Sequence, residues 1–167
     1  GRIAEISDTP LHADTELDAA GHVVCPGFID VHAHVDNVTT YPDHETCAKL
    51  SLLQGVTTLV SGNCGLSVPN VTEFFDRIDK GYPLHQAELL GGSTLRKMVG
   101  ACNIYAPATK EQIDHMCCLA RQGLSQGAAG ISLGVGYTPG TSRDEILALA
   151  TVAREYGRDV SIDTRME

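Results

Sequence analysis

Two histidines separated by one residue form the strongest chemical signal in the sequence. His32 and His34 follow a predicted strand at residues 28–31, and side chains two residues apart in a strand point to the same face. Two neutral imidazoles that project together can bind one divalent cation, with Zn–N distances of about 2.0–2.1 Å. The alternative is a histidine pair that only packs or is solvated. The strand before the pair and Asp36 after it add weight to the metal site, and from these residues alone both interpretations stay open.

A cysteine close to two glycines follows the next predicted strand, at residues 56–60, in the run Gly62-Asn63-Cys64-Gly65. Glycines allow unusual backbone dihedrals and close approach of a neighbouring chain segment. A thiolate there could bind a metal, or act as a nucleophile if its pKa were lowered. Most free cysteines are instead small buried apolar residues, and taken alone Cys64 fits that interpretation better.

A third segment, residues 127–140, is rich in glycine and contains Gly134-Val135-Gly136 after a predicted strand. A dinucleotide-binding loop would need its third glycine one position earlier and a helix directly after it, whereas Pro139 extends the loop. A loop that shapes a substrate site and carries Tyr137 fits better. A plain turn is the alternative.

Strands and helices alternate along most of the chain after Pro26. We predict strands at residues 28–31, 56–60, 85–90, 129–133 and 159–162, and helices at residues 45–54, 71–80, 110–126 and 143–156. Asn70, Thr109 and Ser142 are the expected helix N-caps. Such alternation implies parallel strands joined by helical crossovers, with active-site residues at the carboxyl ends of the strands. Five such steps are too few to close an eight-stranded barrel, which takes about 250 residues.

The composition excludes several classes of function. The chain has 167 residues and a formal charge of −9, with no basic cluster that would bind nucleic acid. No apolar run reaches the length of a membrane span, and no secretory signal is visible. The six cysteines lack the paired spacing of a zinc finger. We therefore expect a cytoplasmic protein with reduced thiols.

Three segments in this order resemble the N-acyl-D-amino-acid deacylase (D-aminoacylase) branch of the amidohydrolase superfamily. They are residues 26–34 with the His-x-His pair, residues 54–65, where Gly-Val-Thr-Thr leads to Asn-Cys-Gly, and residues 127–140. The His-x-His pair marks the superfamily, and the second segment is more specific to this branch. The resemblance spans nearly the whole chain, but only the first part of the family's usual length.

The resemblance implies an α/β fold, namely a metal-dependent TIM (β/α) barrel with a small β-sandwich built from both chain ends. Residues 1–25 would supply part of the sandwich, and we predict short strands at residues 2–7 and 22–25. Residues 26–167 would form the first part of the barrel, so the expected fold is a partial TIM barrel.

The resemblance also implies a site. His32 and His34 look like the metal-ligand pair of the family and Cys64 like its cysteine ligand, with Zn²⁺ as the expected ion. In that chemistry the metal polarises the substrate carbonyl and lowers the pKa of bound water toward roughly 7. We expect Tyr137, Asn63 and Arg165 to contact the substrate. The catalytic aspartate and a further histidine ligand of the family would lie beyond residue 167.

Two positions depart from the family pattern. Asp163 stands where the family has a metal-binding histidine in a His-x-Arg-x-Glu stretch. A carboxylate can bind zinc, so Asp163 is a candidate ligand, although a weakened site would show the same change. Gly92-Ser93 stands where the family has His-Gly before Thr-Leu-Arg, which removes any substrate contact by that histidine.

The predicted function is metal-dependent hydrolysis of the amide bond of an N-acyl-D-amino acid, a small-molecule substrate. One alternative is a cyclic-amide hydrolase of the dihydroorotase or hydantoinase type, which would need a carboxylated lysine at a strand end. Another is a truncated, non-catalytic amidohydrolase chain. The exposed edges of an unfinished sheet would then require a homo-oligomer or a missing C-terminal portion to cover them.

Overall fold

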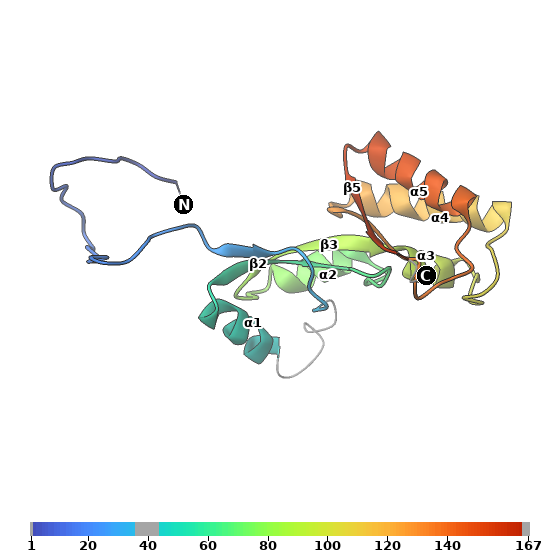
Figure 1. Ribbon diagram of the computed structural model, residues 1–167, viewed down its shortest axis with the longest axis horizontal. Helices are drawn as coiled ribbons and strands as arrows, with labels where there is room; N and C mark the ends of the chain where they lie inside the picture. Colours follow the sequence, from blue (N-terminus) through green and yellow to red (C-terminus); the bar gives the residue numbers. More distant parts are fainter. Residues whose placement is uncertain (1, 36–43, 165–167) are drawn as a thin grey trace.

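The structure is a computed structural model that describes residues 2–35 and 44–164. Five parallel strands form one curled sheet in which each strand pairs with the next strand along the chain (Figure 1). They are β1 (Phe28–Asp30), β2 (Val56–Ser61), β3 (His85–Gly91), β4 (Gly130–Gly134) and β5 (Asp159–Asp163). This strand order is that of a (β/α) barrel, so the predicted partial barrel is confirmed.

Helices connect the strands. They are α1 (His44–Leu53), α2 (Val71–Ile78), α3 (Gly92–Met98), α4 (Lys110–Ser125) and α5 (Arg143–Glu155). Four of these were predicted, within a few residues at each end. Helix α3 was not predicted, because glycine, serine and threonine are poor helix formers and its N-cap, Gly91, has no capping side chain. No helix within the described ranges has the length and apolar content to cross a membrane.

The predicted N-caps are confirmed. Thr109 accepts a hydrogen bond from the backbone of Gln112, whose side chain accepts one from the backbone of Thr109 in return. Asn70 and Ser142 likewise accept from the backbone three residues on. These bonds satisfy amide groups that the first helical turn leaves unpaired.

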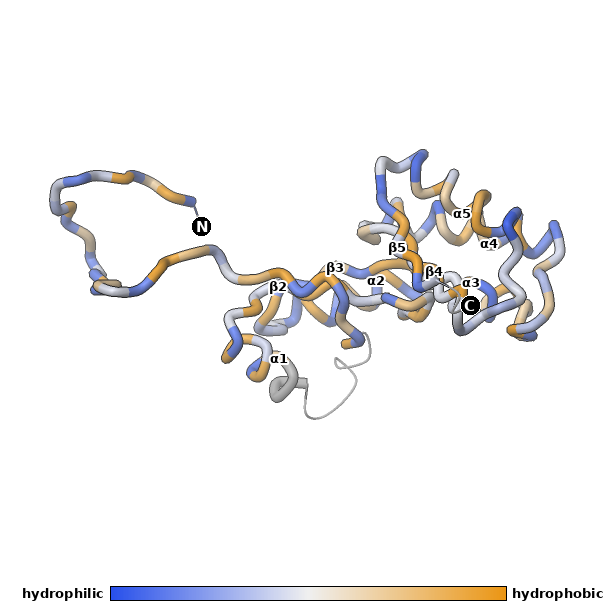
Figure 2. Tube along the Cα trace, viewed as in Figure 1, coloured by the Kyte–Doolittle hydropathy of each residue, from blue (hydrophilic) through white to orange (hydrophobic). Residues whose placement is uncertain are grey.

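The main apolar core lies between the sheet and helices α4 and α5. Its buried side chains include Leu90, Met116, Ala120, Leu124, Ile131, Leu133, Leu149 and Val152. Figure 2 shows apolar residues along the strands and a mixture of polar and apolar residues on these helices. The core therefore buries one face of β3 and β4 under helices α4 and α5.

Both strands predicted in the N-terminal region are wrong. Residues 2–27 contain no strand and extend away from the sheet (Figure 1). A strand needs a neighbour that pairs with its N–H and C=O groups, and no described strand is paired with residues 2–27. The assignment of residues 1–25 to a small β-sandwich stays a prediction.

Strand β1, which the apolar residues at 28, 29 and 31 predict to be buried, is exposed. Phe28 and Ile29 are 60% and 62% accessible. The strand has a neighbour on one side only, β2, so half of its surroundings in the described sheet are open. The strand itself, and the place where it ends, agree with the prediction.

A buried ion pair fastens the loops beside β4. Arg96 Nη1 donates to Glu145 Oε2 at 2.6 Å, and Arg96 Nη2 donates to the carbonyls of Asn103 and Ala106. Burial raises the pKa of Glu145, and the Arg96 charge opposes that rise. The pair joins α3, the loop before α4, and the start of α5. The loop before α4 also binds the loop between β4 and α5, because the N–H of Gly140 donates to the carbonyl of Ile104.

We expect Glu145→Ala to lower the free energy of unfolding by about 3–5 kcal/mol, because the guanidinium of Arg96 would stay buried without its counter-charge. Urea denaturation followed by circular dichroism measures the loss. Glu155→Ala is the matched control, since it removes the exposed Arg121–Glu155 pair and should cost much less. Similar losses for the two variants would contradict the role of burial.

Candidate metal centre

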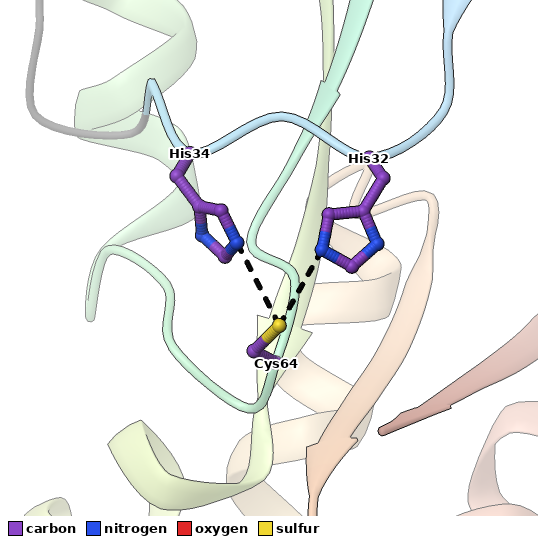
Figure 3. A group of neighbouring side chains, drawn as sticks. All are labelled: His32, His34 and Cys64. Atoms are coloured by element: carbon purple, nitrogen blue, oxygen red, sulfur yellow. Dashed lines mark hydrogen bonds between the residues drawn. The ribbon is translucent and has the colours of Figure 1, made fainter. Parts of the chain in front are cut away.

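Three side chains meet at the carboxyl edge of the sheet (Figure 3). Cys64 Sγ lies 3.4 Å from His32 Nε2 and 3.6 Å from His34 Nε2. All three donor atoms lie within 4.8 Å of one another. The histidines follow β1 and the cysteine follows β2. The structure thus brings together three of the four residues predicted to bind metal.

The spacing of these atoms fits a single cation. In a tetrahedral site with Zn–N near 2.0–2.1 Å and Zn–S near 2.3 Å, nitrogen and sulfur ligands stand about 3.6 Å apart. The two observed N···S distances are close to that value. Both imidazoles also direct Nε2 toward the sulfur (Figure 3). Two nitrogens and one sulfur form a donor set that suits zinc.

Backbone pairing positions the two histidines. The buried Ala33 between them donates its N–H to the carbonyl of Val60 at 3.0 Å, which extends the contact between β1 and β2 past the end of β1. The backbone of His32 is also fixed, because its N–H donates to Asp30 Oδ1. With Ala33 directed into the protein, the rings of His32 and His34 share the opposite, exposed face.

Cys64 stands in a tight turn. Its φ of 55° is in the left-handed region, and it is the one residue other than glycine with a positive φ among the described residues. Such a conformation costs free energy and is kept where surrounding contacts demand it. Gly62 precedes it with a φ of 81°, and a side chain there would overlap the backbone carbonyl of Leu89. The turn therefore lies directly on β3.

The surroundings of Cys64 favour its neutral thiol over the thiolate. Partial burial raises its pKa, and the carboxylate of Asp163, which hydrogen-bonds the thiol, raises it further. A cation beside the sulfur has the opposite effect and favours the thiolate. Cation binding at this site would therefore displace a proton from Cys64.

Asp163 ends β5 and lies beside Cys64, but it is outside the cluster of three donor atoms. The structure thus brings Asp163 to the edge of the candidate site, and its role as a ligand stays a prediction.

The three residues predicted to contact substrate have different surroundings. Tyr137 is 63% accessible, on the loop between β4 and α5. Asn63 is 1% accessible, and its side-chain nitrogen donates to the carbonyls of Val60 and Val31. This position suits a residue that joins the ends of β1 and β2 better than one that contacts a ligand. Arg165 lies outside the described residues.

Sequence reasoning did not identify Ser132, a fully buried serine on β4 whose hydroxyl binds both sides of the Cys64 turn. A polar residue between Ile131 and Leu133 was the available signal. Those two neighbours face the apolar core, so a serine between them must face the other side of the sheet.

A cavity of about 480 Å³ lies elsewhere, between the start of α2 and helices α3 and α4. Its lining includes Ser67 and Thr94 but none of His32, His34 and Cys64. The cavity is therefore separate from the candidate metal centre.

Known proteins are similar to this chain in sequence. A family model described as "Amidohydrolase family" matches residues 15–92. D-aminoacylase of Alcaligenes xylosoxydans xylosoxydans is 34% identical over 181 residues, which cover 93% of this chain and 36% of that protein. N-acyl-D-glutamate deacylase of the same organism is 32% identical, with the same two coverages, 93% and 36%.

A solved structure is also similar. It is N-acyl-D-glutamate deacylase from Bordetella bronchiseptica, complexed with zinc and a phosphonate inhibitor that mimics the tetrahedral intermediate. The TM-score is 0.80 and the sequence identity 32%, over 90% of this chain and 36% of that one. The chain thus spans 36% of the length of each of these three proteins. On the strength of these similarities and of the curled parallel sheet, the chain belongs to the amidohydrolase family, in its N-acyl-D-amino-acid deacylase branch.

Proposed function

We propose that this chain binds Zn²⁺ through His32, His34 and Cys64 and takes part in the hydrolysis of N-acyl-D-amino acids. The single observation that carries the proposal is the approach of Cys64 Sγ to both Nε2 atoms, at 3.4 and 3.6 Å. The names of the relatives support the substrate class, and the zinc complex of one relative supports the metal.

When bound, a divalent cation supplies Lewis-acid chemistry that polarises an amide carbonyl and activates water. The residues of this chain then have separate tasks. His32 and His34 donate neutral nitrogen ligands, and Cys64 adds a negative charge that offsets part of the charge of the cation. Asp163 accepts a hydrogen bond from the Cys64 thiol only while that thiol keeps its proton. Tyr137 stands exposed where it could contact a substrate.

The general base is not assigned to a described residue. The family resemblance assigns that role to an aspartate beyond residue 167. A further histidine, which would bind the metal, is expected there too. Metal binding depends on described residues alone, whereas hydrolysis also needs the general base. The two parts of the proposal are therefore tested separately.

A cyclic-amide hydrolase is the less favoured alternative. That chemistry needs a carboxylated lysine at a strand end. The lysines of this chain lie in helices α1, α3 and α4 or just after α2, at positions 49, 97, 110 and 80. No lysine lies in the part of the described sheet that carries the candidate centre, so no observation supports this alternative.

We expect Cys64→Ser to weaken Co²⁺ binding by at least about tenfold, equivalent to about 1.4 kcal/mol, and to abolish the sulfur-to-cobalt charge-transfer band. His32→Ala and His34→Ala should weaken binding to a similar degree but keep that band. Absorption titration with Co²⁺, a spectroscopic substitute for zinc, measures both effects.

Cys102→Ser is the matched control for this series, because Cys102 is exposed and not part of the cluster of three donor atoms. It should leave affinity and spectrum unchanged. A parent protein without bound cobalt, or a charge-transfer band that survives Cys64→Ser, would refute the metal centre.

We expect Asp163→Asn to lower zinc affinity several-fold, because the attraction between its carboxylate and a cation beside Cys64 is lost. This loss should exceed the gain from the easier deprotonation of the Cys64 thiol, whose pKa Asp163 raises. Competition with a chromophoric chelator gives the affinity. Asp159→Asn, at the opposite end of β5, is the control for a change of net charge without a change at the site. Equal effects of the two substitutions would argue against a local role for Asp163.

We expect zinc-loaded protein that includes the segment with the catalytic aspartate of the family to release D-amino acid from N-acetyl-D-amino acids and to leave the L-enantiomers and hydantoins unchanged. Chiral chromatography of the products measures this directly. Hydrolysis of a hydantoin in preference to the open-chain amides would contradict the deacylase proposal. Zinc binding without turnover of any of these compounds would limit the function of this chain to metal binding.

A further inference from the structure

One buried hydroxyl closes the turn that carries Cys64. Ser132 Oγ donates a hydrogen bond to the carbonyl of Gly62 and accepts one from the N–H of Gly65 at 3.0 Å. Gly62 and Gly65 are the two ends of the turn, and the hydroxyl satisfies one backbone group at each end. Ser132 itself is fully buried, so water cannot easily replace these bonds.

The serine reaches the turn across a strand. Ser132 is on β4 and its register partner on β3 is Gly91, whereas the turn follows β2. A side chain at Gly91 would overlap the carbonyl of Gly65, and one at Gly134 would overlap the carbonyl of Cys64. The absence of side chains at these two positions lets the turn lie directly on β3 and β4, within reach of Ser132.

The turn has other anchors as well. The N–H groups of Ser93 and Thr94 donate to the carbonyl of Gly65, and the N–H of Leu66 donates to the carbonyl of Asn63. Loss of the Ser132 hydroxyl would therefore loosen the turn without unfolding the sheet. The Cys64 backbone, at a φ of 55°, is the part with the most strain to release.

We propose that Ser132 is a positioning residue for Cys64, which holds the turn so that the sulfur meets the same cation as His32 and His34. The inference rests on the proposed metal centre and adds a residue that acts through Cys64 rather than on the metal. Residues that orient metal ligands typically contribute about 10–100-fold to metal affinity.

A double-mutant cycle separates this role from a general structural one. Ser132→Ala should weaken Co²⁺ binding by about 10–100-fold in the parent protein. In the Cys64→Ser background the same substitution should have almost no further effect, because the ligand that Ser132 positions is gone. Titration into the millimolar range keeps weak binding by the two imidazoles measurable.

Two further variants complete the cycle. Ser132→Thr retains the hydroxyl and should recover most of the affinity, and Ser125→Ala, on the exposed end of α4, should change nothing. The inference is overturned if Ser132→Ala leaves affinity unchanged, or if it weakens binding equally with and without Cys64.

Amide hydrogen exchange separates failure of this inference from failure of the metal centre, because it needs no metal. In the metal-free protein, Ser132→Ala should lower the protection of the Gly65 amide, while amides of helix α4 keep theirs. If the parent protein binds no metal, the proposed function fails, and the exchange result alone decides whether Ser132 holds the turn. Unchanged protection at Gly65 would overturn the inference in either case.

Discussion

The candidate site depends on the parallel pairing of β1 with β2. Parallel neighbours end at the same edge of a sheet, so the residues that follow them emerge side by side. Here the ladder continues one step past β1, where the N–H of Ala33 meets the carbonyl of Val60. That bond fixes the two histidines on one face, opposite a cysteine 30 residues away from His34 in the sequence. An antiparallel or shifted pairing would separate the sulfur from both rings.

The second constraint is close packing of backbone on backbone. The loop with Gly134-Val135-Gly136 departs from the glycine spacing of a dinucleotide-binding loop, and Gly134 has a packing role in the structure. It leaves room for the carbonyl of Cys64, as Gly91 does for the carbonyl of Gly65. Gly134, one of the glycines that first suggested a nucleotide site, therefore serves the Cys64 turn. Together with Gly91 it leaves room for the turn to lie within hydrogen-bonding distance of Ser132.

Local patterns made much of this predictable. Thr109 and Ser142 cap their helices as expected, and the ends of β1 and β2 placed His32, His34 and Cys64 at one edge. The predictions that failed depended on contacts between residues far apart in the sequence. Alternation of polar and apolar residues near the N-terminus suggested strands, but a strand is defined by its partner. The bond between Ser132 and Gly65 joins residues 67 positions apart, and no local pattern encodes that distance.

The structure also indicates which contributions to the free energy oppose metal binding. Hydrogen bonds from Ser132, Ser93 and Thr94 hold the turn that carries Cys64, so little conformational entropy of this turn is lost when a cation binds. The remaining cost is the proton of Cys64, because burial and Asp163 both raise the pKa of that thiol. Affinity must therefore rise with pH while the thiol is mostly protonated, since fewer protons have to be displaced. The hydrogen bonds of Ser132 reduce the first cost and leave the second unchanged, so backbone geometry and protonation contribute separately to the affinity of this centre.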